Sequence, residues 1–365
     1  MTLSLLKNMN SLRRPSKAGR CAVLHIGTEK TGTTSLQAYL SEHRSTLYQR
    51  KVLYPQTCGL SCHSRLVAYS KEKPDARLLR MIAVANEPEA ISHWKTRFDK
   101  KHRKEVLRFH SKFSSGTTAI YSSEHFQSLV REKADIERVY ELLSNFYEKI
   151  TLVVYLKRQD RMAFSAHSTA VQLGSSKRFS FNNIGKVYYY DHLQMVSSWA
   201  AVFGAENVRV RVCEKSRLFQ HSVVTDLMHL SGLTSAVSDL SQAVKTNQRL
   251  SLSAIEILLK FNREYCKHTH LGGVSLPAFR AQLVDYLRTL PDESENAALS
   301  EMSARRFNAQ FAASNEQLFA RFLDGNGFDD SYDEYSRTDP EAVHQVPDQL
   351  LDSLIATVLA SREVG

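Results

Sequence analysis

The sequence predicts an α/β fold: a P-loop-like, mainly parallel sheet flanked by helices, with an appended helical C-terminal portion. Over the first 220 residues, short β-branched apolar runs alternate with amphipathic segments. That alternation is typical of a parallel sheet covered on both faces. A glycine turn follows the first apolar run, and beyond residue 220 only helical patterns continue. These observations place a ligand site at the carboxyl ends of the strands.

The elements follow from the periodicity of apolar residues. We expect strands at 21–27, 117–122, 150–156 and 207–213. Between them, helices are expected at 33–49, 88–112, 128–147, 160–173 and 187–203. The later part should hold helices at 221–231, 251–268, 275–289, 297–323 and 346–361, with no further strand. Trp199 and Phe203 lie four residues apart, which indicates a core stripe of a helix.

The pattern divides the chain into three parts. Residues 1–19 are basic without apolar periodicity and are expected to form a flexible arm. Residues 20–325 form the main domain, with an α/β core over 20–220 and a helical part over 221–325. Residues 326–365 add an acidic, turn-rich loop and a terminal helix.

Composition narrows the class of protein. The 365 residues carry a net charge of +10, which suits an anionic ligand. Five cysteines, an odd number, favour reduced thiols and a cytoplasmic location. No apolar run approaches the roughly 18 residues of a membrane span. Cys58, Cys62 and His63 lie close in sequence but lack a second ligand pair, so no metal is expected. The oligomeric state is not predicted.

One segment, 95–112, is strongly basic. It holds eight Lys and Arg residues against Asp99 and Glu105, a balance of +6. A solvated helix face is the simpler interpretation, and a landing surface for an anionic glycan is the alternative. Nucleic acid is disfavoured because no nucleic-acid-binding motif accompanies the charge.

The most informative segment runs from His25 to Ser35, where a strand turns through glycines into a helix. This arrangement directs backbone N–H groups and the helix dipole at one point and predicts a phosphate site. It is not a Walker loop, since Lys30 precedes Gly32 by two residues, and the Gly185-Lys186 pair is followed by Val187.

The order Lys-Thr-Gly-Thr-Thr resembles the 5′-phosphosulfate loop of sulfotransferases that use 3′-phosphoadenosine 5′-phosphosulfate (PAPS) as donor. The resemblance implies that Lys30 lies at the oxygen bridging phosphorus and sulfur. It also implies that the 5′-phosphate is held by the residues after Lys30, which are Thr31, Gly32, Thr33, Thr34 and Ser35.

A second motif strengthens the resemblance. The strand expected at 150–156 ends in Lys157-Arg158, and Ser165 follows in the next helix. In sulfotransferases an arginine and a serine in this region bind the 3′-phosphate of PAPS. Here the family's arginine position, eight residues before the serine, is Lys157, and Arg158 stands seven before. Either cation takes the role with Ser165. The resemblance spans residues 20–325, and this part of the chain is similar to the bacterial glycan and heparan-type branch of the family.

The catalytic base stays open among three residues. His63 lies beyond the helix that leaves the phosphate loop, where relatives of the heparan type place a catalytic group. Glu124 and His125 follow the second long strand and should face the same cleft. Glu29 is unusual, because a carboxylate beside Lys30 repels phosphate unless it points to the acceptor or into an ion pair.

The resemblance implies a sulfotransferase that transfers a sulfuryl group from PAPS to a hydroxyl of an acceptor, and the family analogy together with the basic segment favours a carbohydrate as that acceptor. An amine acceptor is less favoured. The chemistry does not demand a metal, because the sulfuryl group carries less charge than a phosphoryl group. The alternatives are a P-loop kinase using Mg-ATP and a non-catalytic anion- or glycan-binding protein of the same fold.

Overall fold

The computed structural model describes residues 17–113, 116–185, 187–240, 250–291, 299–336 and 346–363. Five parallel strands form the central sheet in the order β2-β3-β1-β4-β5. Their bounds are β1 Arg20–His25, β2 Val52–Leu53, β3 Thr117–Ser122, β4 Lys149–Leu156 and β5 Val208–Val212. The predicted α/β class with a parallel sheet flanked by helices is confirmed.

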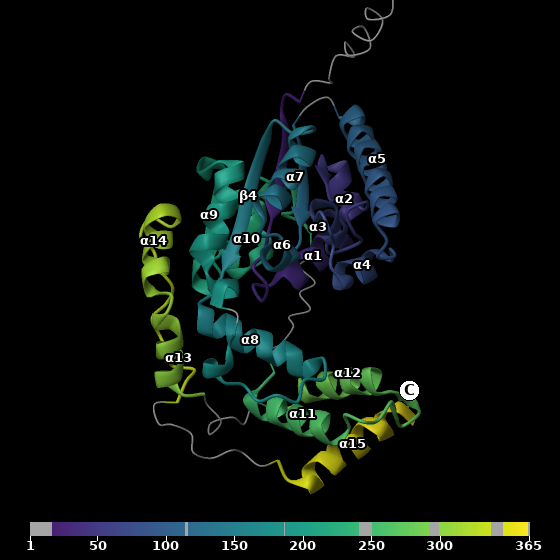
Figure 1. Cartoon of the computed structure of the whole chain (residues 1–365), viewed down its shortest axis with the longest axis vertical. Coiled ribbons are helices and arrows are strands. Elements are labelled where there is room, and N and C mark those ends of the chain that lie inside the picture. Colours follow the sequence, from purple (N-terminus) through teal and green to yellow (C-terminus); the bar gives the residue numbers. More distant parts are fainter. Residues whose placement is uncertain are drawn as a thin grey trace, which may run out of the picture.

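Helices cover both faces of the sheet (Figure 1). One face packs against α5 (Pro88–Lys112), α7 (Lys133–Ser144) and α9 (His192–Phe203). The other face packs against α1 (Thr33–Glu42), α2 (Arg44–Gln49) and α10 (Val223–Leu230). Each face of the sheet thus forms a hydrophobic core with its helices, and alternate residues of each strand pack into the two cores. Leu24 and Leu152 pack into the first core, and Val23 and Val153 pack into the second. Trp199 and Phe203 are buried in the first core, as predicted.

The later helices gather around α8 (Gln159–Gln172), which runs beneath the sheet in Figure 1. α11 (Leu252–Glu264), α12 (Leu276–Leu287) and α15 (Asp348–Glu363) form a second core around Leu258, Phe279 and Leu354. α13 (Glu301–Ala309) packs on α8, and α14 (Ala312–Phe322) packs on α9. α8 therefore connects the sheet to the helical part of the chain.

Short elements complete the upper part of the molecule. They are α3 (Ser64–Ser70), α4 (Ala76–Ile82) and α6 (His125–Leu129). α3 and α4 were not expected, because the sequence pattern predicted no helix between residues 49 and 88. Among the described residues no helix is long and apolar enough to cross a membrane.

Several predicted boundaries were wrong. β2 was not predicted, because a strand of two residues is too short to show periodicity. The helix expected at 33–49 breaks at His43, and 128–147 divides into the end of α6 and α7. The helix expected at 297–323 divides into α13 and α14. A small antiparallel pair, β6 (His270–Leu271) and β7 (Val274–Ser275), contradicts the expectation that strands end at residue 220. Of the predicted arm, residues 1–16 lie outside the described part.

Candidate functional site

The candidate site lies where the parallel strands end. The segment after β1 is fastened to β4 by backbone hydrogen bonds: the Thr28 N–H donates to the Tyr155 carbonyl over 2.8 Å, and the Tyr155 N–H donates to the Gly27 carbonyl over 2.8 Å. Gly27 has a φ of +109°, and a Cβ there would lie 3.2 Å from the Glu124 Cα. A glycine is therefore required for the loop to approach the end of β3.

The N-terminus of α1 opens onto this loop. Gly32, with a φ of +82°, precedes the helix, and no side chain in the described part of the chain caps it. The first N–H groups of an α-helix have no partner within the helix, so those of residues 33–35 are available to an anion. Thr34 is exposed and Ser35 half-buried, whereas Thr33 is buried. The buried Thr31 hydroxyl donates to the Thr28 carbonyl over 2.7 Å, so this hydroxyl holds the loop in shape.

Lys30 reaches from the loop toward α8. Its Nζ donates a hydrogen bond to the Thr169 Oγ1 over 2.7 Å, and that hydroxyl donates onward to the Ser165 carbonyl over 3.2 Å. Burial lowers the pKa of the Lys30 ammonium, while the charges of Glu29 and Glu124 raise it and that of Arg77 lowers it. The ammonium thus stands among charges from three neighbouring segments.

Glu124 follows β3 and lies half-buried at the start of α6. Its Oε2 accepts a hydrogen bond from the Gln37 Nε2 over 2.7 Å, and the Cys62 Sγ lies 3.7 Å from the same oxygen. Burial raises the pKa of the Cys62 thiol to about 12. Potential ligand atoms of Cys62, Glu124 and His125 lie within 4.8 Å of one another.

Glu29 points away from the loop. Its Oε2 accepts a hydrogen bond from the Tyr189 hydroxyl over 2.6 Å, and its Oε1 lies 3.8 Å from the His125 Nδ1. Burial alone would raise the pKa of Glu29, but the donors on His125, Tyr189 and Ser128 outweigh it and lower this pKa to about 2. A carboxylate that ionises so readily is a weak proton acceptor, so Glu29 is suited to positioning.

His63 lies inside the protein, 0% exposed. Its ring stacks on Tyr54 at 4.2 Å between centroids, and its Nδ1 accepts a hydrogen bond from the Ser122 N–H over 3.2 Å. Burial lowers its pKa well below the usual value for histidine. His63 is therefore a neutral ring enclosed between Tyr54 and the end of β3.

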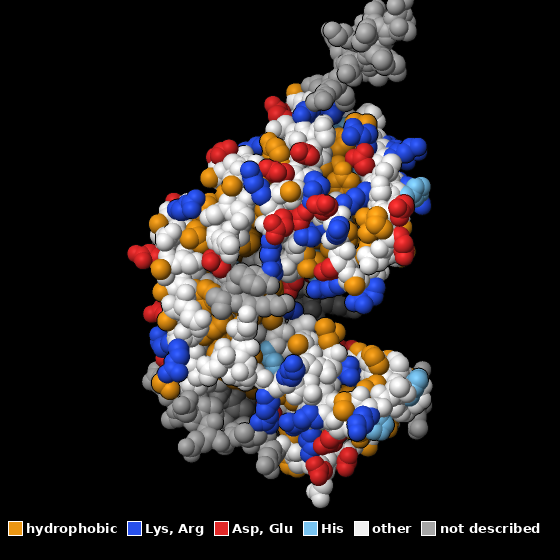
Figure 2. All heavy atoms as spheres, in the orientation of Figure 1, with side chains coloured by type: hydrophobic (Ala, Val, Ile, Leu, Met, Phe, Trp, Pro, Cys, Tyr) orange, Lys and Arg blue, Asp and Glu red, His pale blue; other side chains and the backbone are white. Residues whose placement is uncertain are grey.

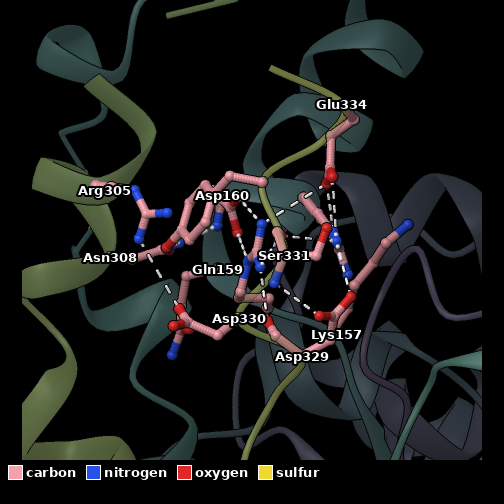
Figure 3. Close-up of polar contacts among 12 residues, drawn as sticks. Lys157, Gln159, Asp160, Arg305, Asn308, Asp329, Asp330, Ser331 and Glu334 are labelled. Atoms are coloured by element: carbon pink, nitrogen blue, oxygen red, sulfur yellow. Dashed lines mark hydrogen bonds and ion pairs between the residues drawn. The ribbon is translucent and has the colours of Figure 1, made fainter. Parts of the chain in front are cut away.

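Arg158 is buried, and its hydrogen-bond partners include Asp160, Asp329 and Ser331, which are labelled in Figure 3. Its Nε and Nη2 donate to the two carboxylate oxygens of Asp160 over 2.8 and 2.9 Å. Its Nη1 donates to the carbonyls of Asp329 and Ser331, both over 2.6 Å, and the guanidinium lies 4.0 Å from the Tyr332 ring centroid. The Nη1 contacts thus fasten residues 329–331 to the end of β4, and the Nε and Nη2 contacts hold the Asp160 carboxylate at the start of α8.

Lys157 has a different environment. It lines a cavity of about 670 Å³ at the carboxyl ends of β4 and β5, which we name the β5 cavity. The Cys213 thiol, another lining residue, donates to the Thr31 carbonyl over 3.4 Å, so this cavity adjoins the loop after β1. The described residues that line it do not include Ser165. Its other lining residues are Arg158, Arg161, Glu214, Lys215, Ser216, Arg217 and Asp329.

A larger cavity of about 970 Å³, the α8 cavity, has Glu29 in its wall. Ala166 and Ala170 contribute one face of α8, and Tyr189 and Tyr190 contribute the segment before α9. The loop after β1 therefore contributes Glu29 to the wall of the α8 cavity, and its Thr31 carbonyl contacts Cys213 in the wall of the β5 cavity.

The structure places Lys30, the α1 N-terminus and Glu124 near one another at the strand ends, and His125 lies beside Glu29. Sequence reasoning missed Thr169, Gln37 and Arg77. Thr169 stands one helical turn after Ser165, a signal that could have found it. Arg77 lies on α4, which carries no periodic pattern that could have identified it.

Comparisons with known proteins give distant similarities. No protein-family model matches the chain. A protein of Archaeoglobus fulgidus described as uncharacterized is 26% identical over 183 residues, which is 47% of this chain and 45% of that protein. The chain thus matches less than half the length of this relative.

Two solved structures are also similar. A sulfotransferase from Alicyclobacillus acidocaldarius has a TM-score of 0.38 at 16% identity, covering 70% of this chain and 98% of that one. The sulfotransferase domain of the Synechococcus PCC 7002 olefin synthase has a TM-score of 0.29 at 13% identity, covering 82% and 98%. At such TM-scores neither likeness carries an argument, so function must be argued from the site itself.

Proposed function

We propose that this protein is a sulfotransferase that moves a sulfuryl group from PAPS to an acceptor hydroxyl, most simply that of a carbohydrate. One observation carries the proposal: Lys30, the uncapped N-terminus of α1 and the Glu124 carboxylate meet at neighbouring strand ends. A cation, an anion cradle and a carboxylate are the groups that sulfuryl transfer requires.

The donor set suits a phosphosulfate. The N–H groups of Thr33, Thr34 and Ser35 and the exposed Thr34 hydroxyl would hold the 5′-phosphate. Lys30 would neutralise the charge that develops on the leaving oxygen. When bound, PAPS supplies the sulfuryl group, and adenosine 3′,5′-bisphosphate leaves.

The 3′-phosphate is best assigned to Lys157. The Arg158 donors are already engaged by Asp160 and by the carbonyls of Asp329 and Ser331. Lys157 lines the β5 cavity, next to the loop that would hold the other end of the donor. A phosphate contact of this kind would select PAPS over ATP.

Glu124 is the best candidate for the base. It is half-buried and near Lys30, so it would accept the proton of the acceptor hydroxyl as the new oxygen–sulfur bond forms. His63 is fully buried, and His125 is 7% exposed with its Nδ1 directed at Glu29. The burial of both histidines supports the assignment to Glu124.

Calorimetric titration with adenosine 3′,5′-bisphosphate and, separately, with Mg-ATP tests this proposal. We expect tight binding of the bisphosphate. Its affinity should be about tenfold weaker in Lys157→Ala and unchanged in the control Lys104→Ala, since Lys104 is an exposed residue of α5. PAPS turnover should fall about 10²–10³-fold in Lys30→Ala. Preference for Mg-ATP would replace the proposal by the kinase alternative. Bisphosphate binding without turnover over a broad acceptor panel would favour the non-catalytic alternative.

A further inference from the structure

The residues that line the α8 cavity carry more positive than negative charge. Among the described residues, four cationic side chains line it: Arg77, Arg131, Lys177 and Arg178. Glu29 is the one carboxylate among the described lining residues, and the Tyr189 hydroxyl already donates to it. An anion entering this cavity would therefore meet a wall of opposite charge.

Among the residues that the structure describes, two of these cations have no counter-ion. Arg77 and Lys177 are exposed, and neither side chain forms a hydrogen bond or ion pair within the described part of the chain. By contrast, Arg178 pairs with Glu256 over 3.1 Å, and Arg131 donates to the Ser128 carbonyl over 2.9 Å. Arg77 and Lys177 thus retain the capacity to bind an external anion.

The two cations come from different parts of the fold. Arg77 lies on α4, beside the sheet, and Lys177 lies in the segment that follows α8. Figure 2 shows the molecule hollowed between these parts, with Lys and Arg side chains along the edge of the hollow below α4. Arg77 is also near enough for its charge to act on Lys30. An anion held here would lie close to the proposed transfer site.

The rest of the wall suits a compact, ring-shaped molecule. Phe179 and Tyr190 supply aromatic surface, and the exposed Asn183 supplies an amide. A volume of about 970 Å³ admits a molecule of disaccharide size. Sugar rings commonly pack on aromatic side chains through their apolar faces, which leaves the anionic group to the cations.

We propose that the α8 cavity selects an anionic acceptor: Arg77 and Lys177 bind a carboxylate or sulfate ester and so direct a separate hydroxyl of the same molecule toward Glu124. This inference rests on the proposed function, since it names the acceptor class of that site. It also differs from the alternative that the basic α5 surface binds anionic glycans, because α5 contributes no residue to the described wall of this cavity.

Matched small probes test the inference on the full chain saturated with adenosine 3′,5′-bisphosphate. The probes are phenyl β-D-glucuronide, phenyl β-D-glucoside and the 6-sulfate ester of that glucoside, each measured by saturation-transfer NMR titration. We expect the two anionic probes to bind at least tenfold more tightly than the neutral glucoside. The order of the affinities of the two anionic probes shows whether a carboxylate or a sulfate ester is the preferred anion.

The variants are Arg77→Ala, Lys177→Ala and the double variant. The double variant should bring the anionic probes to the affinity of the glucoside. Arg80→Ala is the control, because Arg80 is exposed on the same helix but does not line the α8 cavity. If circular dichroism shows that Arg77→Ala is misfolded, Arg77→Gln replaces it.

Equal affinity for neutral and anionic probes, or no binding of any probe, would overturn the inference. Equal losses in Arg80→Ala would overturn it too, by showing a diffuse charge effect. Titration of the bisphosphate into the same samples separates the two proposals. Bisphosphate binding without anion preference removes the inference alone, whereas anion preference without bisphosphate binding removes the proposed function and leaves an anion-selective cavity.

Discussion

The Lys30 ammonium donates a hydrogen bond to the Thr169 hydroxyl over 2.7 Å, across 139 positions of sequence. The hydroxyl accepts this bond and donates its own proton to the Ser165 carbonyl, so both of its roles are used. This contact joins the loop after β1 to α8 and orients the cation on which the proposed chemistry depends.

Thr169 should therefore act as a positioning residue. Thr169→Val keeps the shape and removes the acceptor, and we expect PAPS turnover to fall about fivefold, the equivalent of about 1 kcal/mol. Thr169→Ser should restore it. The check is steady-state kinetics with the bisphosphate Kd measured in parallel: kcat should change more than Kd. Equal activity of the valine and wild-type proteins would remove Thr169 from the mechanism.

Glu124→Gln and His63→Gln distinguish the candidate bases. Glu124→Gln removes the proposed proton acceptor and should lower kcat about 10²–10⁴-fold, with bisphosphate affinity retained. His63→Gln should alter stability more than kcat, because His63 is enclosed against Tyr54. Kinetics and thermal unfolding of both variants check this. Loss of kcat in a stably folded His63→Gln protein would reverse the assignment.

Substitutions of Arg158 and Lys157 should have different effects: Arg158→Ala should lower the stability of the fold, and Lys157→Ala should weaken bisphosphate binding. Arg158→Ala leaves the carboxylate of Asp160, 0% exposed, without its guanidinium partner, although Tyr335 still donates to it. Removing one partner of a buried ion pair costs about 3–5 kcal/mol. Urea unfolding should show this loss in Arg158→Ala and little change in Lys157→Ala. A stable Arg158→Ala protein with weakened bisphosphate binding would instead return the 3′-phosphate role to Arg158.

Buried histidines should make the fold sensitive to acid. Burial lowers the pKa of His25 and His192 to about 4 and that of His102 to about 3, from an ordinary value of 6.5. The unfolded chain then binds more protons than the folded chain below pH 6.5. The contribution of these neutral histidines to the free energy of unfolding is therefore fully present above pH 6.5. It is lost as the pH falls toward 4, by up to about 1.4 kcal/mol per pH unit for each histidine.

Urea unfolding between pH 7 and pH 4 measures this dependence. His102→Gln should reduce its slope, because the glutamine does not titrate. A slope identical to that of the wild-type protein would show that His102 does not contribute to the acid sensitivity.

Local patterns determined much of this fold. The long β strands and helix α5 were predicted because each is a sustained run with a clear apolar period. Strand β2 was missed because two residues show no period, and α4 because its pattern is weak. The break at His43 escaped prediction for a related reason, since the apolar residues Leu36, Leu40 and Leu47 keep a helical spacing across it.

The sequence by itself also determined the anion cradle, because a strand, glycines, Lys30 and a helix start occupy consecutive positions. The tertiary structure decided the rest. It enclosed His63, engaged Arg158 with a segment about 170 residues downstream and turned Glu29 toward Tyr189. It also placed Arg77 and Lys177 in the wall of one cavity. Burial and partner choice depend on contacts between distant segments, and local sequence patterns do not encode which segments meet.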